Sequence, residues 1–125
     1  MADVALIVDD EEIIRDLLEA FLETEGYETY TASSGTEGLR QVYDRRPDVV
    51  ISDVVMPEMD GYEFCCLARE MCDVPIMMVT GVRAESNVLR LSTDIDDYMT
   101  KPLDMDDFLK RIAGLISRSR AGKVL

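Results

Sequence analysis

Short apolar segments alternate with amphipathic segments along this chain of 125 residues. The apolar segments are about five residues long and rich in branched side chains, which is typical of strands buried on both faces. The segments between them carry apolar residues at helical spacing. Because parallel strands need long crossover connections, the alternation predicts an α/β fold, in which one doubly wound parallel sheet has helices on both faces.

The pattern also places the individual elements. The expected strands comprise residues 4–8, 27–32, 48–52, 75–79 and 98–100. The expected helices comprise residues 11–25, 33–44, 62–71 and 84–92, followed by a last helix that begins near 104. The length fits a single domain, which we place at residues 1–119, with a basic tail or the start of a linker at 120–125.

The apolar positions of the helices are expected to face the sheet. In the first helix these positions are Ile13, Ile14, Leu17, Leu18, Phe21 and Leu22. In the second helix they are Leu39, Val42 and Tyr43. In the last helix they are Met105, Phe108, Leu109, Ile112, Leu115 and Ile116.

The charge of the chain limits its partners. The net charge is −13, from 26 acidic and 13 basic residues, and five of the bases lie within residues 110–125, where there is no acid. Residues 1–109 therefore carry a net charge of −18. Such a surface disfavours contact with nucleic-acid phosphates and is compatible with divalent cations and basic proteins.

The sequence favours a cytoplasmic protein. Its apolar runs are too short for a membrane span, and we expect no secretory signal. The cysteines Cys65, Cys66 and Cys72 form an odd set with two adjacent members, which makes a poor disulfide framework. With no histidine in the chain they also fail to make a zinc site, so we expect reduced thiols packed on a helix.

Polar side chains follow the expected strands at the point where each strand ends. They are Asp9 and Asp10 after the first strand, Asp53 after the third, Thr80 and Gly81 after the fourth, and Lys101 after the fifth. In doubly wound sheets the ligand lies beyond the carboxyl ends of the strands, where the strand order reverses. We therefore expect these groups to meet at one edge of the sheet.

Carboxylates gathered in this way need a cation, because like charges disfavour each other's ionised form. An oxygen-only donor set favours a hard ion such as Mg²⁺, which keeps several waters and often binds phosphate oxygens as well. A carboxylate such as that of Asp53 can attack phosphorus and form an acyl phosphate. Lys101 and the Thr80 hydroxyl could then hold the phosphoryl oxygens.

Each of these residues also has a purely structural explanation. Asp9 and Glu12 have the spacing of a capping box at the start of a helix, and Asp53 could simply begin a loop. Thr80 could belong to a turn, and Lys101 could be a solvated lysine. For Asp9 and Glu12 considered alone, a capping box is as good an explanation as a metal site. The occurrence of all these groups at successive strand ends nevertheless favours a functional site.

Four segments resemble receiver domains of two-component response regulators, the CheY-like family. They are LIVDDEE at 6–12, DVVISDVVMPEMDGYEF at 48–64, PIMMVTG at 75–81 and DDYMTKPLDMDDFLKRI at 96–112. The resemblance covers residues 3–119. It implies a flavodoxin-like (βα)5 domain with the strand order 2-1-3-4-5.

The resemblance assigns a role to each acidic position. Asp53 corresponds to the phosphoacceptor. Asp10 corresponds to the direct Mg²⁺ ligand, and Asp9 beside it binds the ion through water or tunes the charge. The backbone carbonyl of Val55 completes the metal contacts.

The resemblance also implies a switch. Thr80 corresponds to the switch hydroxyl, and Lys101 to the phosphate-binding lysine, with a cis peptide bond to Pro102. Tyr98 corresponds to the aromatic side chain that turns inward with Thr80, although it could also be an ordinary half-buried strand residue. Phosphorylation would then rearrange the face made by the fourth helix, the fifth strand and the last helix.

The implied partners are a sensor histidine kinase or a phosphotransfer protein, with no membrane and no nucleic acid bound by this domain. The domain would be no enzyme, although receiver domains assist their own phosphorylation and dephosphorylation. Asp96, Asp97 and Arg111 stand where one subfamily pairs charges across a homodimer, and solvated surface charge explains them equally well. Residues 94–96 depart from the family's usual Gly-Ala turn, which predicts an altered loop.

Three other functions compete with this interpretation. A Mg²⁺-dependent phosphohydrolase with an aspartyl-phosphate intermediate needs a second acid two residues after the nucleophile, where Val55 stands. A flavin or nucleotide carrier needs a glycine-rich loop after the first strand, where acids stand instead. A receiver that only binds partners would not need the complete set of acids, Thr80 and Lys101.

Overall fold

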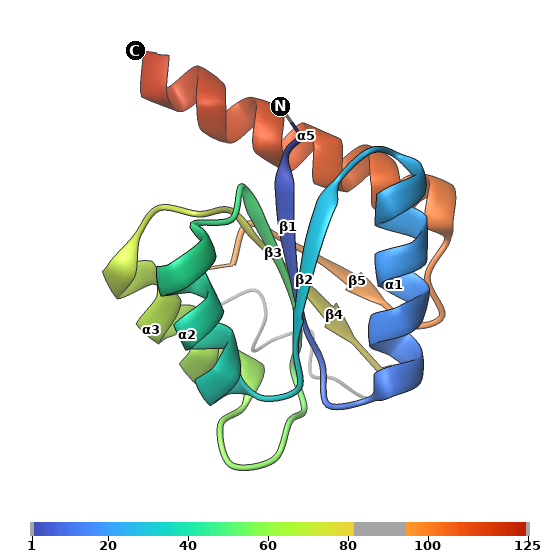
Figure 1. The fold of residues 1–125 in the computed structure, drawn as a ribbon, viewed down its shortest axis with the longest axis vertical. Helices are drawn as coiled ribbons and strands as arrows, with labels where there is room; N and C mark the ends of the chain where they lie inside the picture. Colours follow the sequence, from blue (N-terminus) through green and yellow to red (C-terminus); the bar gives the residue numbers. More distant parts are fainter. Residues whose placement is uncertain (1, 82–94, 125) are drawn as a thin grey trace.

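Among the residues that the computed structural model describes, 2–81 and 95–124, parallel strands form one sheet in the order β2-β1-β3-β4-β5 (Figure 1). The strands are β1 (Val4–Val8), β2 (Glu28–Ala32), β3 (Val49–Asp53), β4 (Ile76–Thr80) and β5 (Asp97–Thr100). The expected strands, the parallel sheet and the order 2-1-3-4-5 are therefore confirmed. The order reverses between β1 and β3, so the carboxyl ends of these two strands flank the expected site.

The helices lie on both faces of the sheet (Figure 1). They are α1 (Glu12–Thr24), α2 (Gly35–Arg45), α3 (Gly61–Met71) and α5 (Met105–Val124). The helix expected at 84–92 lies outside the described residues. Helices α2 and α3 cover one face of the sheet, and α1 and α5 cover the other (Figure 1).

Local hydrogen bonds explain where α2 and α3 begin. The Ser34 hydroxyl accepts a hydrogen bond from the Glu37 amide at 3.2 Å, and the Asp60 carboxylate accepts one from the Glu63 amide at 2.9 Å. Both are side-chain caps that satisfy an amide of the first helical turn. Helix α1 has no such cap, because the residue before it is Glu11, whose side chain makes no capping bond. The capping box suggested by the spacing of Asp9 and Glu12 is therefore not the arrangement found.

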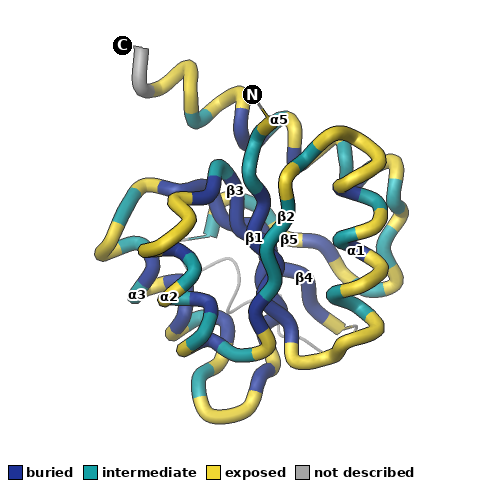
Figure 2. Tube along the Cα trace, in the orientation of Figure 1, coloured by how far each residue is buried: buried dark blue, intermediate teal, exposed yellow. Residues whose placement is uncertain are grey.

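The strands divide the core into two layers, because successive side chains of a strand point to opposite faces. Leu6 and Val8 of β1 pack with α2 and α3, whereas Ala5 and Ile7 pack with α1 and α5. Every residue of β3 and β4 is buried, and Figure 2 shows this burial along the middle of the sheet. The edge strands β2 and β5 are more exposed. This pattern accounts for the continuous apolar runs in the central strands.

Three of the apolar helix residues expected to face the core are exposed. The exposed fractions are 80% for Ile13, 42% for Leu17 and 64% for Tyr43. At roughly 100° per residue, the six apolar residues of α1 form a stripe that spans about half of the helix circumference. Only the side of this stripe that contains Leu18 packs against the sheet. In α2 the Tyr43 ring lies outside and stacks with Arg46, whose guanidinium carbon is 5.3 Å from the ring centroid.

The far end of α5 is tied to the amino-terminal edge of the sheet. Arg120 donates to the carboxylate of Asp3 at 2.6 Å and to that of Asp48 at 3.4 Å. The other carboxylate oxygen of Asp48 accepts from the Val4 amide at 2.7 Å. Helix α5 extends through Val124, so most of the segment 120–125 that was expected to be a tail is helical.

The structure also tests two expectations from the sequence, on membrane-spanning helices and on disulfide bonds. Within residues 2–81 and 95–124, no helix combines the length and apolar character that a membrane span requires. Among the described residues, Cys65, Cys66 and Cys72 form no disulfide bond. Cys65 is buried in α3, Cys66 is exposed on the same helix, and Cys72 is half-buried at its end.

Glycine is required where α3 begins beside the end of β3. The Gly61 amide donates to the Val54 carbonyl at 2.7 Å, which holds the two backbones together. A Cβ atom at Gly61 would overlap the carbonyl oxygen of Asp53 and lie 2.9 Å from the Cα atom of Val54. The loop that carries Asp53 therefore depends on the absence of a side chain at residue 61.

The two sides of α1 predict different sensitivities to truncation. Leu18 is 2% exposed, so we expect Leu18→Ala to lower the free energy of unfolding by about 2–5 kcal/mol through the lost burial and the cavity. Ile13→Ala on the exposed side should change it by less than about 0.5 kcal/mol. Urea denaturation of both variants measures the difference. Equal losses would contradict the orientation of α1.

The close approach at Gly61 predicts a second difference, between two glycine-to-alanine variants. Gly61→Ala should destabilise the fold by about 1–3 kcal/mol, because backbone atoms must move to admit the methyl group. Gly114→Ala is the control, since Gly114 lies inside α5 with no atom near its Cβ position. It should stabilise the fold by about 0.5–1 kcal/mol. Thermal and urea denaturation would contradict the packing at Gly61 if both variants shifted stability in the same direction.

Candidate functional site

The carboxyl edge of the sheet brings together three of the residues expected there. Asp9 follows β1, Asp53 ends β3, and Lys101 follows β5. The Lys101 ammonium lies 3.4 Å from Asp9 Oδ2 and 3.5 Å from Asp53 Oδ2. Both carboxylates are buried, with exposed fractions of 2% for Asp9 and 6% for Asp53. A buried carboxylate needs a partner, and Lys101 is shared between two.

Backbone contacts fix Asp9 in this position. Its amide donates to the Ala32 carbonyl at 3.1 Å, which extends the pairing of β1 with β2 by one residue. Its Oδ1 atom accepts from the Glu11 amide at 2.9 Å, and its carbonyl accepts from Nη1 of Arg15 at 2.7 Å. The sequence interpretation did not single out Arg15, because a contact from α1 back to the loop before it has no distinctive spacing.

Four carboxylates lie together at this edge. Asp9, Asp10, Glu11 and Asp53 each offer an oxygen atom, and these atoms all lie within 4.8 Å of one another. Glu11 was not among the expected site residues. The run of four acids at 9–12 was the available signal, and it became a site feature here because α1 begins only at Glu12, which leaves Glu11 in the loop.

The chemistry of this donor set fits a hard divalent cation. All the donors are oxygen atoms, which suit Mg²⁺ or a similar ion rather than a soft metal. Lys101 supplies one positive charge against four carboxylates, so the group retains a net negative charge that a divalent cation can compensate. The residues present could therefore hold a metal ion at the carboxyl edge.

The pKa values of Asp9, Asp53 and Lys101 are all raised, each by a different balance of burial and neighbouring charge. Burial raises the pKa of Asp9, against a hydrogen bond from the Glu11 amide, and the charge of Asp53 adds to the rise. Burial also raises the pKa of Asp53, although Lys101 and the amides of Val54 and Val55 act in the opposite sense. For Lys101, burial disfavours the charged form, but the carboxylates of Asp53 and Asp9 outweigh it and raise its pKa.

Thr80 and Val55 lie at the same edge of the sheet. Thr80 ends β4 and is fully buried, and its hydroxyl lies 3.5 Å from the Gly81 carbonyl. The Thr80 carbonyl accepts from the Lys101 amide at 2.7 Å, which links β4 to the residue that carries the ammonium. Val55 follows Asp53 by two residues, and its apolar side chain is 73% exposed. Its backbone amide acts to lower the pKa of the Asp53 carboxyl group, against the effect of burial.

Tyr98 lies further from the edge, in the middle of β5. It pairs with Met78 of β4, and 38% of it is exposed. Its carbonyl accepts a hydrogen bond from Arg111 of α5 at 3.4 Å. The peptide bond between Lys101 and Pro102 is cis, as the resemblance implied.

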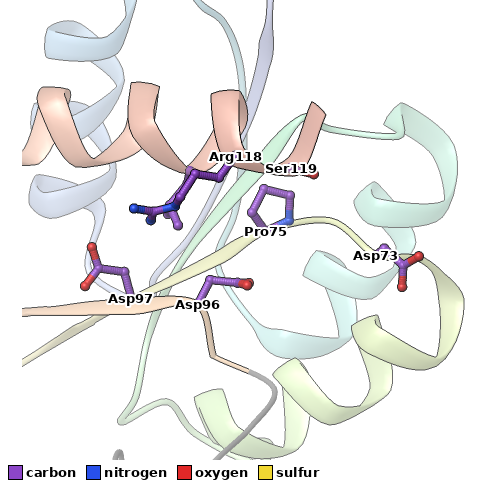
Figure 3. A pocket seen from close by; sticks show the side chains of 7 residues that line it. Asp73, Pro75, Asp96, Asp97, Arg118 and Ser119 are labelled. Atoms are coloured by element: carbon purple, nitrogen blue, oxygen red, sulfur yellow. The ribbon is translucent and has the colours of Figure 1, made fainter. Parts of the chain in front are cut away.

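A cavity of about 570 Å³ lies at the opposite edge of the sheet and contains none of the expected site residues (Figure 3). It is lined by Asp73, Pro75, Asp96, Asp97, Leu115, Arg118 and Ser119. Asp96 accepts from Arg69 at 2.7 Å and from the Ile76 amide at 2.8 Å, and Asp97 accepts from Arg111 at 3.1 Å. Asp96 belongs to the segment 94–96 that departs from the family's Gly-Ala turn. Its carboxylate links the residue before β5 to α3 and β4. The charges at 96, 97 and 111 pair within one chain.

Comparisons with known proteins agree with this geometry. Residues 5–113 match the family described as response regulator receiver domain. A CheY-like receiver domain protein from Methanospirillum hungatei is 30% identical, with a TM-score of 0.91 over 98% of this chain and 99% of that one. A receiver domain protein from Clostridium thermocellum is 30% identical, with a TM-score of 0.89 over 95% of this chain and 98% of that one.

A third solved structure places the same fold in a kinase. The receiver domain of a signal transduction histidine kinase from Syntrophus aciditrophicus is 33% identical, with a TM-score of 0.83 over 93% of this chain and 91% of that one. The matches cover nearly the whole chain, and the carboxyl-edge site lies inside them. The chain therefore belongs to the response regulator receiver domains of two-component signal transduction.

Proposed function

We propose that this receiver domain accepts a phosphoryl group on Asp53 with the help of Mg²⁺. The observation that carries the proposal is the position of the Asp53 carboxylate, which is buried at the end of a central strand between the Lys101 ammonium and three further carboxylates. An oxygen of Asp53 attacks the phosphorus of a phosphohistidine donor. The bond between phosphorus and the imidazole nitrogen breaks, its electron pair returns to the nitrogen, and an acyl phosphate remains on Asp53.

The neighbouring residues have separate tasks in this reaction. Asp10, Asp53 and the Val55 carbonyl would hold the cation directly, and Asp9 would act through water. When bound, Mg²⁺ neutralises charge that develops on the phosphoryl oxygens. Lys101 compensates the charge of the phosphorylated side chain, since its ammonium already lies 3.5 Å from Asp53.

A groove beside the site suits the phosphodonor protein, a sensor histidine kinase or a phosphotransfer protein. The groove has a volume of about 470 Å³. It is lined by Ile14, Leu17, Leu18, Gly81, Lys101, Pro102, Leu103 and Met105. With the exposed Ile13 and Leu17 of α1 it offers an apolar surface next to the Lys101 ammonium. Exposed apolar surface of this kind supports a protein contact.

The output of the domain would be a change at the face formed by the predicted fourth helix, β5 and α5. Thr80 would turn toward the phosphoryl group and Tyr98, now half-exposed, would turn inward. Arg111 binds Asp97 and the Tyr98 carbonyl, so a movement of Tyr98 reaches α5 directly. Dimerisation through this face would require Arg111 to exchange its contact with Asp97 for one with a second copy.

This function is that of a phosphoacceptor rather than of an enzyme with a separate substrate. A Mg²⁺-dependent phosphohydrolase would need an acid where Val55 stands, and the exposed Val55 side chain cannot exchange protons. The domain would assist only its own phosphorylation and the hydrolysis of its own acyl phosphate.

Phosphorylation on Asp53 can be tested by intact mass spectrometry. After incubation with acetyl phosphate and Mg²⁺, the wild type should gain the mass of one phosphoryl group, and the adduct should be labile to hydroxylamine, which cleaves acyl phosphates. Asp53→Asn should gain none, because an amide is a poor nucleophile. Asp60→Asn, which changes an exposed acid at the start of α3, is the matched control and should behave as the wild type. An equal adduct on Asp53→Asn, or none on the wild type, would contradict the proposal.

The role of Lys101 can be tested separately. Lys101→Ala should slow phosphorylation by acetyl phosphate roughly a hundredfold, since one preorganised charge partner of the phosphoryl group is lost. Lys110→Ala, which removes an exposed lysine of α5, should have no such effect. The rate of adduct formation is followed by mass spectrometry at fixed Mg²⁺. Equal rates for the two variants would remove Lys101 from the reaction.

A further inference from the structure

Glu11 lies in the site without a structural task of its own. It is the residue before the first turn of α1, with an extended backbone, and its side chain makes no capping hydrogen bond. Instead its carboxylate lies 3.7 Å from the Lys101 ammonium and within 4.8 Å of oxygens from Asp9, Asp10 and Asp53. The Glu11 side chain is 62% exposed, whereas those of Asp9 and Asp53 are buried. Glu11 thus stands on the solvent side of the cluster.

We propose that Glu11 is an outer-sphere carboxylate of the cation site, which binds a water molecule of the ion and raises the affinity of the site for Mg²⁺. The inference rests on the proposed function of the cluster as a Mg²⁺ site. It adds a residue that neither the family's motif nor the sequence interpretation assigned to that task. Glu11 acts here as a positioning residue, because it touches the hydration shell and not the reacting atoms.

The size of the ion decides between direct and water-mediated contact. Mg²⁺ holds its ligands at about 2.0–2.1 Å in a near-octahedral shell, dehydrates reluctantly and usually takes only one or two carboxylates. Asp10 and Asp53 would fill that share, so further carboxylates of the cluster must act on bound water. Of these, Asp9 already accepts from the Glu11 amide and lies 3.4 Å from Lys101. The exposed Glu11 carboxylate faces the solvent side, where the remaining waters of the ion must lie.

The charge of the cluster supports the same role. Four carboxylates and the Lys101 ammonium leave three net negative charges, and a divalent cation reduces these to one. Removal of the Glu11 charge alone would leave two net negative charges. The electrostatic attraction between the cluster and one Mg²⁺ would then be weaker than in the wild type. Near a solvent-exposed group the effect is screened but not abolished at distances of a few ångströms.

Glu12 provides a matched control for this inference. It adjoins Glu11, is exposed, and lies in the first turn of α1 outside the carboxylate cluster. Glu11→Gln and Glu12→Gln therefore remove the same charge from neighbouring positions with the same change of shape. We expect Glu11→Gln to weaken Mg²⁺ binding about fivefold and Glu12→Gln to weaken it less than about twofold. Glu11→Asp should keep most of the affinity, because a water molecule can bridge the shorter side chain.

The measurement is a calorimetric titration of the unphosphorylated protein with MgCl₂ alone, so no phosphorylation enters the result. Thermal unfolding without metal, in which none of the three variants should lose stability, separates metal binding from a structural role. Equal affinities of the Glu11→Gln and Glu12→Gln variants would overturn the inference. A loss above about a hundredfold would also overturn it, because it would make Glu11 a direct ligand. Failure of the wild type to bind Mg²⁺ would instead refute the proposed function itself.

Discussion

The ammonium of Lys101 between two buried carboxylates is the interaction on which the site depends. Asp9 and Asp53 lie on neighbouring strands at the reversal of strand order, where both are withdrawn from water. Lys101 comes from β5, two strands away from β3, and reaches past β4 to lie 3.5 Å from Asp53. That reach requires a side chain with a long flexible stem. A side chain as short as that of threonine could not reach Asp53 from the end of β5. Backbone pairing of Lys101 with Thr80 directs the stem toward the site.

The rest of the fold supplies the rigid edge that this interaction needs. Strands β3 and β4 are buried along their whole length, and each face of the sheet has its own apolar layer. The absence of a side chain at Gly61 lets α3 begin against the Asp53 carbonyl, so the loop after β3 is held close to the strand. At the opposite edge, Asp96 joins Arg69 to the Ile76 amide and thereby fixes where β5 begins. The position of Lys101 at the far end of β5 depends on that start, because β5 is only four residues long.

Hydrophobic periodicity was sufficient to predict every described element, and the rule for ligands at strand ends was sufficient to bring Asp9, Asp53 and Lys101 together. The strand order required the family resemblance, because spacing alone leaves several doubly wound orders open. Periodicity alone could not show which part of a wide apolar stripe meets the sheet, so Ile13, Leu17 and Tyr43 were wrongly expected in the core. Contacts between side chains distant in sequence, such as Arg69 with Asp96, carry no local pattern at all. Glu11 was missed for a different reason, since its role depends on the helix beginning one residue later than expected.

A site of this kind is well suited to a switch because its charges are shared. Lys101 balances Asp9, Glu11 and Asp53 together, so a change at any one of them alters its balance with the others. In the proposed reaction, the acyl phosphate adds negative charge at Asp53 and draws the ammonium toward it. The Lys101 amide is bonded to Thr80, and the Tyr98 carbonyl of the same strand is bonded to Arg111 of α5. In the proposed switch, a charge added at the carboxyl edge would act on β5 through Lys101, and it would reach α5 through the hydrogen bond from the Arg111 side chain to the Tyr98 carbonyl.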